Sequence, residues 1–184
     1  SGAFAVAATA PLLGRFADGQ GAFRTCLAIA TAIGALATAG LWFVEPDISF
    51  AMLALGLSAV SIFAMEISFV FYNAMLPSVA REDEFGRASG LAWGLGYAGA
   101  IVALVIVLLL FVLPDHPAFG VSTEGAGHIR ITMCFAALWL CLFAVPLFIF
   151  VPAPPATRSS APFLASLKDS LRIAMTIPGL PRFL

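Results

Sequence analysis

Residues 11–24 read Pro-Leu-Leu-Gly-Arg-Phe-Ala-Asp-Gly-Gln-Gly-Ala-Phe-Arg, a short polar turn between two long apolar runs. The turn contains two of the nine basic residues of the chain, Arg15 and Arg24, and Asp18 follows Gly14 by four positions. An apolar run that ends in a polar, glycine-containing turn and then resumes is typical of a helix that leaves a membrane and re-enters it. This stretch therefore predicts a protein that crosses the bilayer more than once.

The composition supports this prediction. Of 184 residues, 61% are hydrophobic and 10% are charged, whereas soluble domains have about a quarter of their residues charged. The net charge of -1 provides no basic surface for phosphates, which argues against a nucleic-acid partner. Because the chain starts without Met and inside an apolar run, we expect it to be a piece of a longer protein, cut within one membrane helix.

A helix needs about 20 apolar residues to cross a hydrocarbon layer of roughly 30 Å. By this measure the chain has five candidate membrane spans, the first of them truncated. They lie at about 1–16, 25–44, 48–72, 88–113 and 130–151. Their apolar residues are continuous rather than alternating, so we expect an all-α polytopic membrane bundle rather than a β-barrel. Residues 1–151 would form a partial N-terminal transmembrane bundle in contact with the lipid bilayer.

The positively charged residues predict the orientation. With five spans, Arg130 lies alone on one side of the membrane, and eight residues lie on the other: Arg15, Arg24, Arg81, Arg87, Arg158, Lys168, Arg172 and Arg182. Cytoplasmic loops are enriched in Lys and Arg. We therefore expect the turns at 15–24 and 73–87 and the tail after 151 to be cytoplasmic, and the segments 45–47 and 114–129 to face outward.

Residues 152–184 have a different pattern from the spans. After a proline-rich start, Leu164, Leu167, Leu171 and Ala174 recur at helical spacing. This predicts a cytoplasmic central loop with an amphipathic helix that lies on the membrane face or against a partner. A plain linker between two helix bundles is an equally compatible interpretation.

The opening turn resembles a transporter signature. The pattern Gly14-x-x-x-Asp18-x-x-Gly21-x-x-Arg24 is similar to the motif between the second and third helices of the major facilitator superfamily, although Gly19, Ala22 and Phe23 stand where that family has basic residues. The resemblance implies that the five spans are helices two to six of twelve, in the N-terminal half of a major-facilitator fold. It also implies a missing C-terminal helix bundle and a cytoplasmic gate at Gly14, Asp18, Gly21, Arg24, Arg81 and Arg87.

Further segments narrow the resemblance to the vacuole-effluxer (autophagy-related permease-like) family. They are Phe71 to Pro77, Gly86 to Gly90, Trp93 to Tyr97, Ala137 to Trp139 and Phe143 to Phe148. The resemblance implies a secondary active transporter, a permease or effluxer, that moves a small solute by alternating access and needs no cofactor. Amino acids are the implied candidate solutes. Such a protein would lie in the cell (inner) membrane of a bacterium or in the vacuolar membrane of a fungus.

The candidate coupling or substrate residues are Glu66, Asn73, Ser61, Ser68 and Tyr97. Glu66 is the first of them, because its side chain is the ionisable group well inside an apolar span. A carboxylate in hydrocarbon costs at least about 2.5 kcal/mol, so we expect it to face protein or water. Glu66 could titrate during transport or bind an amine, or it could be a clamp bonded to Asn73, a backbone group or an arginine. Ser61, Ser68 and Tyr72 form a second polar stripe about 140° round the same helix.

Other residues are weaker candidates. Tyr97 and the two serines are expected to line a cavity, whereas Trp93 and Trp139 are interpreted as packing residues. Gly86, Gly90 and Gly94, with Gly96 and Gly99 nearby, predict close helix packing, either as a sliding contact or as a static one.

No enzyme chemistry is indicated. His116 and His128 lack the spacing of metal ligands, and no nucleophile–base pair is found, so neither a metal site nor an enzyme is expected. The competing function class is a non-transporting multi-span scaffold or assembly subunit.

Overall fold

A computed structural model describes residues 23–152 of the chain. Four long helices cover most of this part: α2 (Phe23–Gly40), α3 (Ala51–Ala74), α4 (Phe85–Val107) and α5 (Gly127–Phe150). With their short flanking turns, all four are long and apolar enough to cross a membrane. Residues 23–152 contain no strand. The predicted all-α, polytopic membrane fold is therefore confirmed.

Short helical turns extend the spans. The 3-10 turns Leu41–Phe43 (η1) and Ile48–Phe50 (η2) flank the tight turn between α2 and α3, and Leu76–Ser78 (η3) and Glu82–Glu84 (η4) connect α3 to α4. The helix α4 starts at Phe85 directly after three acidic residues, which favour a helix N-terminus through its dipole. Residues 1–16, where a span is expected, and residues 153–184, which contain the pattern of the expected amphipathic helix, lie outside the described residues.

The loop between α4 and α5 is the least regular part of the described chain. The helix α4 continues into a π-helical turn at Leu108–Val112 (η5), and two 3-10 turns follow, Ala118–Gly120 (η6) and Glu124–Ala126 (η7). Phe119 and Ala126 have positive φ angles of 61° and 54°, a conformation that costs a non-glycine residue energy.

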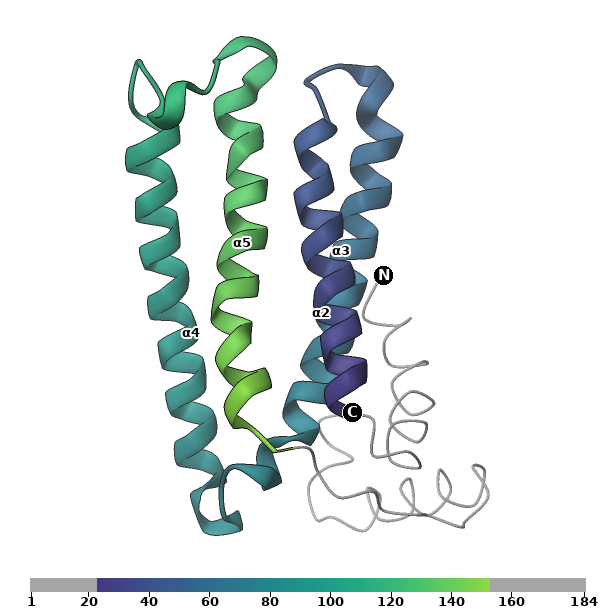
Figure 1. Ribbon diagram of the computed structural model, residues 1–184, viewed down its shortest axis with the longest axis vertical. Coiled ribbons are helices and arrows are strands. Elements are labelled where there is room, and N and C mark those ends of the chain that lie inside the picture. Colours follow the sequence, from purple (N-terminus) through teal and green to yellow (C-terminus); the bar gives the residue numbers. More distant parts are fainter. Residues whose placement is uncertain (1–22, 153–184) are drawn as a thin grey trace, which may run out of the picture.

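The four helices run side by side, with α5 between α4 and α2 and with α3 behind α2 in the view of Figure 1. The helix α2 packs along both α3 and α5. The start of α2, the α3–α4 turn and the end of α5 lie at the lower end in Figure 1. Arg24, Arg81 and Arg87 belong to these segments, so we name this end the cytoplasmic end, after the prediction from charge.

The hydrophobic core lies in the cytoplasmic half, between α2 and α3. Its buried members are Phe23, Leu27, Ala30, Ile67, Phe71 and Met75, and Leu147, Phe148 and Val151 of α5 pack against them. Phe71 is 2% exposed, and its ring meets that of Phe23 edge to face, with centroids 6.2 Å apart. This core fixes α3 and α5 on either side of α2.

A row of hydroxyl groups joins α2 to α3 in the remaining part of their interface. The Thr38 and Ser61 side-chain oxygens are 2.7 Å apart, and Thr38 also donates to the Gly34 carbonyl oxygen at 2.8 Å. Two turns away on each helix, Thr31 donates to Ser68 at 3.4 Å. Gly34 is buried between the two helices, and its missing side chain allows the close approach that hydrogen bonding between membrane helices requires. We name this row the hydroxyl seam.

At the opposite end, Arg130 connects α5 to the α2–α3 turn. Its Nε donates to the Trp42 carbonyl oxygen at 2.6 Å, and its Nη1 donates to the Gly125 carbonyl oxygen and to Glu45 Oε1, both at 3.3 Å. The guanidinium also lies 5.0 Å from the centroid of the Trp42 ring. The arginine that stands alone on the predicted outer side is thus paired, and only 17% of its side chain is exposed.

Candidate functional site

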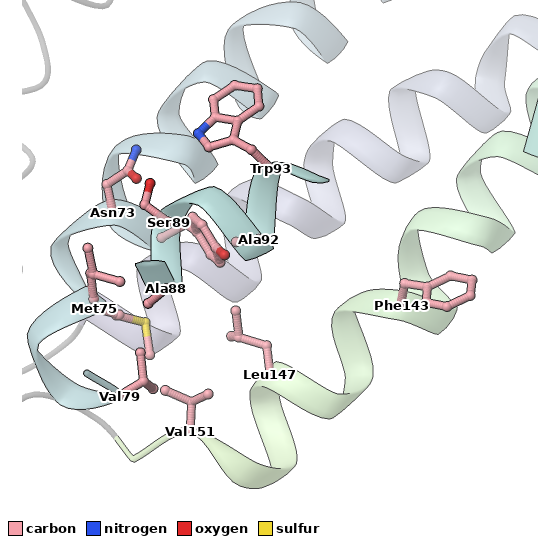
Figure 2. Close-up of a pocket in the computed structure, with 12 residues that line it drawn as sticks. Asn73, Met75, Val79, Ala88, Ser89, Ala92, Trp93, Phe143, Leu147 and Val151 are labelled. Carbon is pink, nitrogen blue, oxygen red and sulfur yellow. The ribbon is translucent and has the colours of Figure 1, made fainter. Parts of the chain in front are cut away.

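A groove opens between α3, α4 and α5 near the cytoplasmic end (Figure 2). Its volume of about 410 Å³ falls within the range of small-molecule sites. Asn73 of α3, Ser89 of α4 and Leu147 of α5 are among the residues that line it (Figure 2). All of the residues that line the groove are uncharged. We name it the cytoplasmic compartment.

A second cavity of about 380 Å³ lies further along α3 and α4, and its lining includes Phe69, Gly96, Tyr97 and Ala100. Tyr97 follows Phe85, the first residue of α4, by 12 positions, or about 18 Å at 1.5 Å per residue. That depth is close to the middle of a hydrocarbon layer of roughly 30 Å. We name this cavity the midplane compartment, and its lining is also uncharged.

Four aromatic rings connect α3 to α4 along these two compartments. Phe69 stacks on Tyr72 at a centroid distance of 6.2 Å and meets Trp93 edge to face at 5.5 Å, and Trp93 lies 5.8 Å from Tyr97. Such geometries are favourable for aromatic pairs. In this aromatic ladder the Phe69–Trp93 pair crosses from α3 to α4, and the other two pairs each lie within one helix.

Several polar groups in the two compartments are free to hydrogen-bond to a solute or to water. Asn73 Nδ2 donates to the Phe69 carbonyl oxygen at 2.9 Å. Within residues 23–152, the structure gives no hydrogen bond to the Tyr72 hydroxyl, the Ser89 hydroxyl or the Trp93 indole N–H. Polar groups without partners are costly at membrane depth. Water or a solute in the groove would satisfy them.

Glu66 lies on a different face of α3 from the hydroxyl seam. At 100° per residue it is about 160° round the helix from Ala64, which is buried, and Glu66 itself is exposed. No described residue forms a hydrogen bond or ion pair with it, and Asn73 bonds to Phe69 instead. Glu66 therefore faces away from α2 and lies outside the linings of both compartments.

Comparison with known proteins identifies the family. The family model described as "Vacuole effluxer Atg22 like" matches residues 2–184. The chain belongs to the Atg22-like vacuole effluxer family. It is also similar to a protein of Bacillus subtilis (strain 168) named "Uncharacterized MFS-type transporter YxiO", with 28% identity over 144 residues, or 78% of this chain and 33% of that protein. No solved structure matches the chain.

The predicted resemblance to an effluxer family of the major facilitator superfamily is thus confirmed. This Atg22-like chain is a multi-pass integral membrane protein, and it spans about a third of the length of the curated relative that it matches. The relative's printed name assigns it to a transporter superfamily and gives no solute.

The polar residues predicted for the Atg22-like chain do not gather in one place. Ser61 and Ser68 belong to the hydroxyl seam between α2 and α3. Ser68 also borders a third groove, of about 380 Å³, between α2, α3 and α5. Tyr97 lines the midplane compartment, and Asn73 lines the cytoplasmic one.

The expected gate residues are only partly described. Gly14, Asp18 and Gly21 lie outside the described residues. Arg24 is in the first turn of α2, and Arg87 is in the first turn of α4. Arg81 Nε is 3.3 Å from Asp83 Oδ1, and 81% of the Arg81 side chain is exposed.

The glycines expected to pack helices lie on α4 and have no neighbour in the described part of the chain. A Cβ atom placed on Gly86, Gly90, Gly94, Gly96 or Gly99 would meet no described atom within 4 Å. Large apolar side chains of the same helix are also exposed, among them Leu95 at 72%. Any close packing by these glycines must involve another part of the full-length protein or a partner.

The sequence-based site candidates do not include Tyr72, Ser89 or Trp93, although Tyr72 lies on the predicted polar stripe with Ser61 and Ser68. Trp93 was expected to be a packing residue, yet it is 52% exposed and lines both compartments. A signal was present, because each of the three lies in a segment that carries the family resemblance: Phe71 to Pro77, Gly86 to Gly90 or Trp93 to Tyr97. Polar and aromatic residues inside such segments would have predicted the lining of the compartments better than polar residues alone.

Proposed function

We propose that the full-length protein is a secondary active transporter that moves a small solute by alternating access. The observation that carries this proposal is the pair of adjoining compartments, which extends from the cytoplasmic end to the middle of the membrane. Membership of an effluxer family and the printed name of the Bacillus relative support it. Amino acids, the solutes implied by the resemblance to fungal members, are the first class to test.

In this proposal the described helices move as part of one bundle against a C-terminal bundle of the same protein, as in other transporters built from two halves. Gly86, Gly90 and Gly94, which recur every four residues along α4, supply the close contact, because they have no side chains to separate two backbones. Arg24, Arg81 and Arg87 act at the cytoplasmic end together with Gly14, Asp18 and Gly21. The gradient of a coupling ion supplies the free energy, so no cofactor takes part.

Glu66 is the proposed coupling residue. It precedes Ala74, the last residue of α3, by eight positions, or about 12 Å. A carboxylate at that depth is costly in lipid, so the exposed face of α3 that carries it must face the rest of the protein or a water-filled path. Protonation on one side of the membrane and release on the other would couple transport to a proton gradient.

The test uses the full-length protein in liposomes with a panel of radiolabelled amino acids and an imposed pH gradient. We expect gradient-driven flux in the parent protein, and we expect Glu66→Gln to flatten the dependence of flux on pH. Glu84→Gln is the matched control, because Glu84 is exposed in the α3–α4 turn and its change should leave the pH profile as it is.

Each alternative has its own result. Identical pH profiles for Glu66→Gln and the parent would reject the coupling role alone. Flux of other solutes but of no amino acid would reject the amino-acid assignment. A folded protein that moves no member of a broad solute panel would instead support a non-transporting scaffold.

A further inference from the structure

Tyr72, Ala92 and Trp93 line both the cytoplasmic compartment and the midplane compartment, so they form the wall that the two cavities share. Trp93 lies at the edge of the cytoplasmic compartment in Figure 2, on the first half of α4. It follows Phe85 by eight positions, which places it about 12 Å along the helix. The wall therefore lies well inside the membrane, away from the arginines at the helix ends.

The side chains of this wall are lightly held. Trp93 and Tyr72 are 52% and 41% exposed, and their aromatic pairs are with the other members of the aromatic ladder, Phe69 and Tyr97. A Cβ atom at Gly96, three residues after Trp93, would meet no described atom within 4 Å. The indole thus has open space beside it and can change its rotamer without repacking the core.

We propose that Trp93 and Tyr72 form an aromatic gate that opens and closes the passage between the two compartments. The closed arrangement is the observed ladder, in which Trp93 meets Phe69 edge to face at 5.5 Å. Rotation of the indole toward the space over Gly96 opens the wall. The part of the proposal that concerns solute rests on the proposed transport function, whereas the gate itself rests on the geometry of α3 and α4.

The indole N–H and the Tyr72 hydroxyl give the gate a chemical character. Both groups lack a hydrogen-bond partner within residues 23–152, and no charged side chain lines either compartment. A passing solute therefore meets aromatic faces and neutral hydrogen-bonding groups at this point. Aromatic rings pair favourably with other rings and attract cations. Because the gate has no charged side chain, it selects among solutes by their shape and polarity and not by ion pairing.

Thiol labelling of the full-length protein tests the gate. Cys26, Cys134 and Cys141 are replaced by serine, together with any cysteine in the rest of the chain, and a single cysteine is introduced as Ser89→Cys or as Ala100→Cys. Ser89 lines the cytoplasmic compartment, and Ala100 lines the midplane compartment. The probe is a membrane-impermeant trimethylammonium methanethiosulfonate, applied to the cytoplasmic side of inside-out membrane vesicles.

We expect Trp93→Ala to raise the labelling rate of Ala100→Cys by about tenfold or more, as for removal of a lid, and to leave that of Ser89→Cys within about twofold. Trp93→Phe keeps a ring in the wall and should give a rate near that of the parent. Trp139→Ala is the matched control, because it removes an indole from α5 that lines neither compartment. It should leave both rates unchanged.

An Ala100→Cys rate that stays at the parent value in both Trp93→Ala and Tyr72→Ala would overturn the gate. An equal rise at both cysteines would also overturn it, since that result indicates general loosening of the bundle. If the labelling depends on Trp93 but the parent moves no solute, the gate stands and the transport function fails. If the parent transports and the labelling is independent of Trp93, the gate alone fails.

Discussion

Arg130→Ala is expected to destabilise the protein far more than removal of an arginine that forms a similar ion pair at the other end. Arg130 and Arg81 each place a nitrogen 3.3 Å from a carboxylate oxygen, of Glu45 and Asp83 respectively. Their surroundings differ, since 17% of the Arg130 side chain is exposed against 81% for Arg81. Burial and the additional bonds of Arg130, not the ion pair, should decide the difference.

The expected magnitude follows from the contacts of Arg130. A hydrogen bond from a charged donor, such as the one to the Trp42 carbonyl oxygen at 2.6 Å, contributes about 1.5–3 kcal/mol. The cation–π contact with the Trp42 ring adds about 0.5–1 kcal/mol. The pair with half-exposed Glu45 adds about 0–1 kcal/mol, because solvent screens it. We therefore expect Arg130→Ala to lower the free energy of unfolding by about 2–5 kcal/mol.

Thermal unfolding of the full-length protein in mild detergent, followed by size-exclusion chromatography, measures the effect. At about 2 °C per kcal/mol, Tm should fall by about 4–10 °C for Arg130→Ala. Arg81→Ala should lower Tm by no more than about 2 °C, as expected for an exposed pair. Arg130→Lys should lie between Arg130→Ala and the parent, because lysine keeps the charge but lacks the planar fork. Equal Tm values for Arg130→Ala and Arg81→Ala would refute the reasoning.

Three further predictions concern single positions. Gly127→Ala should lower Tm although alanine favours helices, because its Cβ would lie 2.6 Å from a backbone carbonyl oxygen. Gly34→Ala should lower Tm less, because the close contact of its Cβ would be with the flexible end of a methionine side chain. Hydrogen bonds from the side chain and backbone of Ser49 hold the pKa of the Asp47 carboxyl below its ordinary value of 3.8. The stability that this carboxylate contributes is therefore present above pH 3.8 and lost as the pH falls through the lowered folded pKa, so the Tm difference between Asp47→Ala and the parent should narrow in acid. Gly94→Leu should reduce transport or assembly of the full-length protein if the glycines of α4 pack closely, and a variant with parent-like flux and Tm would contradict that packing.

The helices were predictable from the sequence because membrane spans depend on local properties. A run of about 20 apolar residues identifies a span wherever its partners lie, so the stretches at 25–44, 48–72, 88–113 and 130–151 were found without knowledge of packing. The family was predictable for a similar reason, since its segments are short and contiguous. These features need no information about which helix faces which.

The candidate site depends on neighbours that are distant in sequence. Helical periodicity placed Ser61 and Ser68 on one stripe of α3, but it gave no reason why α2, rather than a cavity, should cover that stripe. Trp93 meets Phe69, which is 24 positions away in the sequence. The half-exposed state of Trp93 depends on the distance between α3 and α4, and the local sequence around Trp93 does not predict that distance. Arg130 bonds to Trp42, which is 88 positions away in the sequence, and the residues around Arg130 do not predict this partner.

The separation of Arg130 from Trp42 has a consequence for biosynthesis. The bond between them cannot form until the ribosome has added the 88 residues that follow Trp42, which takes roughly 4–18 s at about 5–20 residues per second. During that interval α5 is not yet complete, so α2 can pack against α3 but not against α5. The hydroxyl seam, with Thr38 and Ser61 2.7 Å apart, is then available to keep the nascent hairpin in register while it waits for α5.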